Sequence, residues 1–135
     1  MEAKGTFKFT ISPAETSPFE QGMGVVRYEI DKAWTGDFVG SSNGEMLATS
    51  TESTGSRAYV TIEKVTGKLN GKSGTFCFAH KAVMIGDDAT TSEMTVEVIK
   101  GSGTGELAGL RGELNIIIDD AGNHSYLLDY QAPND

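Results

Sequence analysis

Cysteine, histidine and basic residues are scarce in this sequence of 135 residues. A single cysteine, Cys77, excludes an intrachain disulfide and a thiolate-rich zinc site. The two histidines form no cluster, so we expect no metal site. Eleven basic residues against 19 acidic residues give a net charge of −8. A surface of that charge repels nucleic acid and anionic lipid, so we expect neither as a partner.

Long apolar runs are also absent. The longest have four residues, as at 82–85, which is far too short to cross a membrane. Residues 1–6 contain no apolar segment of the kind found in secretory signals. We therefore expect a cytoplasmic protein that folds as a single domain over residues 1–135.

Alternation of apolar and polar residues is the dominant pattern. A period of two is typical of half-buried antiparallel strands, and glycine is abundant, with 17 residues. The alternating segments are 7–11, 26–31, 56–65, 75–80, 94–99, 114–119 and 126–130. About eight strands at hairpin spacing predict an all-β fold with a closed antiparallel barrel, and a β-sandwich is the alternative.

Asn-Gly pairs predict two tight hairpins, because both residues tolerate the positive φ of a type I′ turn. These pairs are Asn70-Gly71 and Asn43-Gly44. Segments 12–24 and 82–92 lack alternation and are predicted to be long loops. Segment 105–110 is the best candidate for a helix, but the glycines in and after it limit it to a turn.

Two motifs with possible chemistry are interpreted as structural. Residues 103–108 fit the loose dinucleotide pattern G-x-G-x-x-A, but no helix pattern follows to hold a phosphate. We interpret them as a glycine-rich corner and expect no cofactor. Cys77 and His80 lie three residues apart on a strand, so they point to opposite faces and cannot form a nucleophilic pair. Cys77 is therefore expected to be a small buried apolar residue.

Candidate site residues lie on faces assigned to the barrel interior. Lys8 opposes Phe7, Phe9 and Ile11, which places these three inside. The same argument assigns seven candidate site residues to the interior: Tyr28, Tyr59, Glu63, Phe76, Phe78, His80 and Tyr126. The two phenylalanines would wall a cavity, with Phe7 and Phe9, and the tyrosines would orient polar groups of a ligand.

Glu63 and His80 are the candidate catalytic acid and base, because burial raises a carboxyl pKa towards neutrality. They lie on the two arms of the hairpin predicted at 70–71, offset by two residues, which allows a diagonal approach. We expect His80 or a tyrosine hydroxyl to be the hydrogen-bond partner of Glu63. The alternative is a structural network inside a filled barrel.

Three longer segments carry a family resemblance. Residues 59–76 with His80, residues 102–112 and residues 124–130 resemble a small bacterial family of unassigned function, described as having a barrel like that of allene oxide cyclase. The plant cyclase converts an unsaturated fatty-acid epoxide into a cyclopentenone in an apolar cavity, and it assembles as a trimer. The resemblance implies a barrel with a ligand cavity, but no cyclase catalytic motif is matched here.

Three functions remain open at this point. The barrel binds a small apolar or amphipathic molecule and cyclises or isomerises it; it carries or senses such a molecule without reaction; or it is a filled structural module. The resemblance and the outward apolar residues Val60, Ile62, Ile99 and Ile117 also predict a dimer or trimer.

Overall fold

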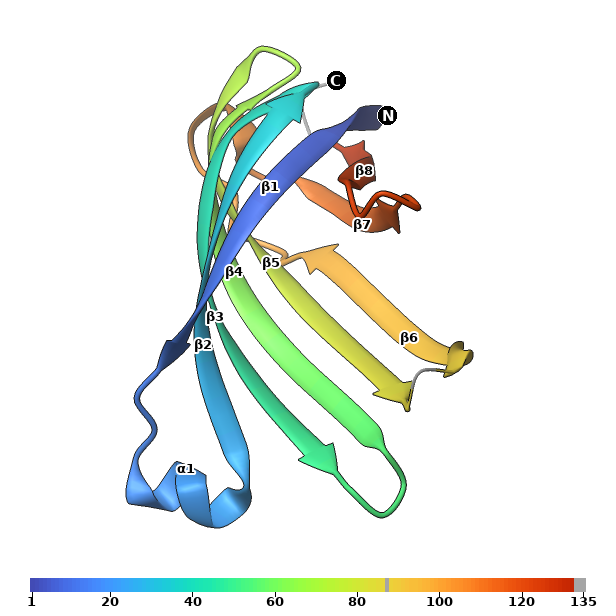
Figure 1. Ribbon diagram of the computed structural model, residues 1–135. Coiled ribbons are helices and arrows are strands. Elements are labelled where there is room, and N and C mark those ends of the chain that lie inside the picture. Colours follow the sequence, from blue (N-terminus) through green and yellow to red (C-terminus); the bar gives the residue numbers. More distant parts are fainter. Residues whose placement is uncertain (87, 133–135) are drawn as a thin grey trace.

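The computed structural model describes residues 1–86 and 88–132, and these form a closed barrel of eight strands in which every neighbouring pair is antiparallel (Figure 1). The elements in chain order are β1 Glu2–Ala14, α1 Pro18–Met23, β2 Val25–Gly36, β3 Phe38–Thr51, β4 Ser56–Leu69, β5 Lys72–Ile85, β6 Asp88–Val98, the 3-10 turn η1 Gly105–Leu107, β7 Arg111–Ile118 and β8 His124–Gln131. The predicted all-β barrel is confirmed. None of the helices in the described ranges has the length and apolar character that crossing a membrane requires.

One of the two predicted Asn-Gly hairpins is present. Asn70 and Gly71 have φ values of 47° and 85° and join β4 to β5, with Leu69 paired to Lys72. The hairpin at Asn43-Gly44 was a wrong prediction, because β3 runs straight through both residues. Its pairing with β2 on one side and β4 on the other outweighs the local turn preference.

Both predicted long loops contain regular structure. Within 12–24 the chain completes β1 and forms α1, where the Ser17 side chain accepts a hydrogen bond from the Glu20 backbone and Glu20 accepts one from the Ser17 backbone. This reciprocal capping box stabilises a helix start. Within 82–92, β5 and β6 continue towards a tight turn at Gly86, and Ile85 pairs with Asp88. The turn expected within 105–110 is confirmed as η1.

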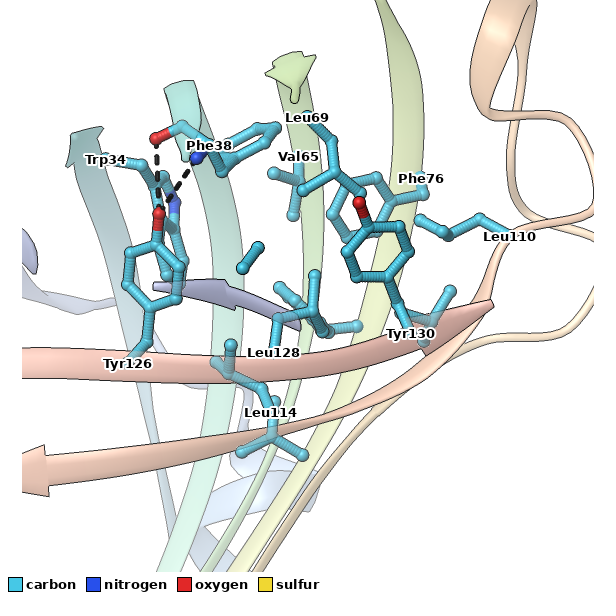
Figure 2. Packing of buried hydrophobic residues seen from close by; sticks show 14 of the residues in the cluster. Trp34, Phe38, Val65, Leu69, Phe76, Leu110, Leu114, Tyr126, Leu128 and Tyr130 are labelled. Atoms are coloured by element: carbon cyan, nitrogen blue, oxygen red, sulfur yellow. Dashed lines mark hydrogen bonds between the residues drawn. The ribbon is translucent and has the colours of Figure 1, made fainter. Parts of the chain in front are cut away.

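The barrel end that holds the 70–71 hairpin, here the closed end, is filled by side chains (Figure 2). The Tyr126 hydroxyl accepts a hydrogen bond from the Phe38 backbone N–H at 3.0 Å and donates one to the Thr35 carbonyl at 3.0 Å. Leu107 and Leu110, from η1 and the corner after it, are at most 1% exposed. The buried cluster also includes Trp34, Phe38, Val65, Leu69, Phe76, Phe78, Leu114, Leu128 and Tyr130.

The opposite end, here the open end, has fewer strands around it. β7 and β8 have eight residues each, whereas β3, β4 and β5 have 14. β1 pairs with β8 only as far as Phe7, although β1 continues to Ala14. Within the described residues, the register of β6 with β7 is a single pair, Glu97 with Glu113, and β6 diverges from β7 (Figure 1). The barrel is therefore closed beside the core and open along one side below it.

Candidate functional site

A pocket of about 120 Å³ lies inside the barrel, between the filled core and the open end. An apolar cavity of roughly 150 Å³ is large enough to hold benzene. The lining residues are Phe7, Phe9, Ile11, Ile30, Lys32, Met46, Tyr59, Thr61, His80, Met94, Ile116 and His124. A wider pocket of about 460 Å³ adjoins it towards the open end, and the two share Tyr59 and Met94.

Strand register brings the polar side chains together on the inner wall. Thr61 and Glu63 both lie on the inward face of β4, and Thr61 pairs directly with His80 on β5. Glu63 pairs with Phe78, so Glu63 and His80 are diagonal neighbours, as the sequence predicts. Lys32 reaches the same wall from β2.

Lys32 and Ser42 are the partners of Glu63. The Lys32 ammonium donates to Glu63 Oε2 at 2.9 Å, and the Ser42 hydroxyl donates to Oε1 at 2.6 Å. Ser42 in turn accepts a hydrogen bond from the Trp34 indole at 2.9 Å. The predicted partner, His80 or a tyrosine hydroxyl, was therefore wrong. Lys32 shares the inward face of β2 with Tyr28, so the sequence could have identified it as an inward residue. The sequence contains no signal that its side chain contacts Glu63 on β4.

Glycine at position 44 keeps the path between Lys32 and Glu63 open. β3 lies between the strands that carry them, and Gly44 pairs with Ile30 on one side and Glu63 on the other. A Cβ atom at position 44 would lie 3.3 Å from both Cα and Cβ of Glu63, which is a tight contact. The missing side chain therefore leaves space for the ion pair to form across β3.

The Lys32 ammonium also lies over aromatic rings. Its nitrogen is 5.1 Å from the centroid of Phe7 and 5.5 Å from that of Trp34. The side chains of Lys32 and Glu63 are only 9% and 2% exposed. A pair shielded from water in this way interacts more strongly than one on the surface.

His80 and Tyr59 form a second polar pair, with 3.0 Å between the ring Nε2 and the phenol oxygen. Burial, assisted by the nearby Lys32 cation and opposed by Glu63, lowers the pKa of His80 to about 4. Burial also raises the pKa of Tyr59. At neutral pH the site therefore holds a neutral imidazole beside a neutral phenol, a combination that can accept or donate a hydrogen bond.

The structure separates the predicted site residues into three groups. Tyr59 and His80 line the inner pocket, and Tyr28 lines the adjoining one. Glu63 faces inward but is 1% exposed and lies outside the pocket lining. The third group is Phe76, Phe78 and Tyr126, which point inward but fill the closed end. Their prediction as residues that line the cavity was therefore wrong. Alternation identifies an inward side chain without telling at which depth of the barrel it lies.

The outer surface agrees with most of the predicted faces. Val60, Ile62 and Ile117 are more than half exposed, whereas Ile99 and Cys77 are half-buried. Self-association stays a prediction. Among residues 1–86 and 88–132, no group of three histidine, cysteine or acidic side chains is placed to hold a metal ion.

A family model described as "Protein of unknown function (DUF3224)" matches residues 3–130. The chain belongs to the DUF3224 family. A crystal structure of a DUF3224 protein with unknown function, from Shewanella oneidensis MR-1, is 34% identical and has a TM-score of 0.85. The match covers 98% of this chain and 96% of that one. No curated protein matches the chain.

The resemblance to a bacterial family of unassigned function is thus confirmed, together with the barrel fold. The likeness to allene oxide cyclase stays a prediction. The DUF3224 description assigns no activity, so any function has to be argued from the barrel interior itself.

Proposed function

We propose that this DUF3224 barrel binds a small, mainly apolar molecule in the pocket between its core and its open end. The observation that carries the proposal is the composition of the pocket: its lining is mainly apolar and includes a few polar groups, from Lys32, Tyr59, Thr61, His80 and His124. Binding sites for small molecules usually combine an apolar lining with a few polar groups that fix orientation.

The exposure of inward apolar residues supports binding over a purely structural barrel. Phe9, Ile11 and Met94 line the pocket and are each 44–45% exposed. In the closed half, Phe76 and Phe78 occupy inward positions and are 2% exposed. Apolar side chains that face a pocket without being covered are stabilised by an apolar ligand that removes them from water.

Acid–base catalysis is a second candidate, favoured by the position of the His80 ring at the pocket wall beside the Tyr59 phenol. An imidazole that donates its Nε2–H to Tyr59 keeps the lone pair of Nδ1, which can take a proton from a carbon beside a carbonyl, with the C–H electron pair moving into an enolate. Returning the proton to another carbon completes an isomerisation that needs no oxidant or reductant. The Tyr59 phenol would orient the ring through its hydrogen bond.

Toluene is a suitable probe, and methionine methyl NMR reports where it binds. We expect saturable shifts of the methyl signals of Met46 and Met94, which line the pocket, and none at Met1. Met94→Trp should fill the pocket and abolish the shift at Met46. Thr95→Trp, one residue along β6 and facing outward, is the matched control and should leave it unchanged.

Two results would contradict binding in the barrel. One is the lack of any saturable shift at Met46. The other is a shift confined to Met23, since Met23 lines a groove of about 370 Å³ on the outer surface beside α1 and not the interior.

A further inference from the structure

Thr61 has a buried hydroxyl without a partner. The residue is 4% exposed, and its Oγ1 makes no hydrogen bond within the described part of the chain. Buried polar groups are nearly always hydrogen-bonded, and one that is not destabilises the fold. Thr61 also lines the pocket, so a bound molecule can reach the position where its partner is missing.

The groups around Thr61 show which kind of partner fits. Lys32 lines the same pocket, and its ammonium donates one hydrogen bond, to Glu63. An ammonium group has three hydrogens, and beyond Glu63 this one contacts, among the described residues, the rings of Phe7 and Trp34, which are weaker acceptors than an oxygen atom. No aspartate or glutamate lines this pocket, and Glu63 is 1% exposed. The inner end therefore has spare donors and no carboxylate to receive a cationic ligand.

We infer that the ligand carries an acceptor oxygen, of a carbonyl or a carboxylate, which accepts a hydrogen bond from Thr61 and faces the Lys32 ammonium. This inference rests on the proposed function and narrows its ligand class. The remainder of the ligand is apolar and lies among Ile30, Met46 and Met94. A protonated amine would find no carboxylate in the lining to pair with, and a pure hydrocarbon leaves the hydroxyl of Thr61 unpaired.

Three six-membered ring probes of similar shape test this class. Cyclohexanone carries a carbonyl oxygen, cyclohexanecarboxylate carries an anionic one, and methylenecyclohexane replaces the carbonyl by an alkene without an acceptor. Each is titrated against the full chain, with the Met46 and Met94 methyl signals as the readout. The variants are Thr61→Val, which removes the hydroxyl and keeps the shape, and Thr66→Val, an exposed control on the outer face of β4.

We expect Thr61→Val to weaken binding of cyclohexanone by about three- to tenfold, the size of one hydrogen bond. Methylenecyclohexane should bind equally to both forms. Without ligand, Thr61→Val should melt at the same temperature as the parent chain or higher, because an unpaired buried hydroxyl is lost. Thr66→Val should change neither affinity. A preference for the carboxylate over the ketone in the parent chain, lost in Lys32→Met, would identify the acid as the ligand form.

The failure of this inference is distinguishable from the failure of the proposed function. If methylenecyclohexane and cyclohexanone bind equally well, and Thr61→Val affects neither, the pocket binds ligands but the acceptor inference is wrong. If none of the three probes shifts the methyl signals of the parent chain, the proposed function itself is contradicted. A fall in melting temperature for Thr61→Val would show that the hydroxyl has a partner inside the fold, which also overturns the inference.

Discussion

Replacing Lys32 by methionine tests whether the ion pair inside the barrel holds the pocket wall together. The substitution leaves the Glu63 carboxylate, with a side chain 2% exposed, with Ser42 as its remaining hydrogen-bond partner. At 2.9 Å and an effective dielectric constant of about 20, the lost attraction is on the order of 6 kcal/mol. Methionine recovers apolar contact with Phe7 and Trp34. We therefore expect a net loss of about 3–5 kcal/mol in the free energy of unfolding, the usual effect of breaking a buried pair.

The assay is a double-mutant cycle measured by urea unfolding at pH 7. Glu63→Gln alone should cost about 2–4 kcal/mol, because Lys32 retains its aromatic contacts and reaches the pocket. The double variant Lys32→Met/Glu63→Gln should be more stable than the sum of the two losses predicts, by at least about 2 kcal/mol.

An exposed ion pair provides the control for this cycle. Arg27 lies 3.3 Å from Glu45, and their side chains are 29% and 67% exposed. Glu45→Gln, at the more exposed end of this pair, should therefore cost less than about 1 kcal/mol. Losses at Lys32 and Glu63 that add to within about 0.5 kcal/mol would show that the two charges do not interact across β3.

Three further substitutions test other parts of the fold by urea unfolding. The pKa of His80 is about 4 in the folded chain against 6.5 unfolded, so the unfolded chain binds the proton first as the pH falls. The contribution of His80 to the free energy of unfolding is therefore full above pH 6.5, and it decreases by up to about 3 kcal/mol as the pH falls towards 4. His80→Gln should lose this pH dependence, and His124→Gln should keep it. Gly71→Ala should cost about 1–2 kcal/mol, because φ is 85° and nothing else crowds the site, whereas Gly22→Ala in α1 should cost nothing. Tyr126→Phe should cost about 1–3 kcal/mol by leaving the Phe38 N–H unpaired, and an unchanged stability would contradict that role.

The inward or outward direction of a side chain could be predicted from the sequence because it depends on period two alone. Glu63 shares its face with Tyr59, and it faces inward as expected. The Asn70-Gly71 hairpin could be predicted for a similar reason, since its turn geometry is a property of the two residues. By contrast, Asn43-Gly44 has the same local preference, and pairing with two neighbouring strands overrides it.

Depth within the barrel and contacts across strands could not be predicted. Phe78 and His80 are two residues apart on one face, yet Phe78 belongs to the core and His80 to the pocket. That difference arises because β7 and β8 end halfway along the barrel, which alternation does not reveal. The contact of Lys32 with Glu63 depends on the register of three strands and on the missing side chain at Gly44. The segment that holds α1 was predicted to be a loop, although Ser17 and Glu20 have the spacing of a capping box that could have indicated a helix start.

The most direct test of binding inside the barrel is a crystal structure of the chain soaked with cyclohexanone. We expect electron density for the ring between Met46 and Met94, with the carbonyl oxygen within hydrogen-bond distance of Thr61 Oγ1. Density confined to the outer groove beside Phe19 and Met23, or an interior in which Phe9 and Met94 close over Thr61 and exclude the probe, would contradict this expectation.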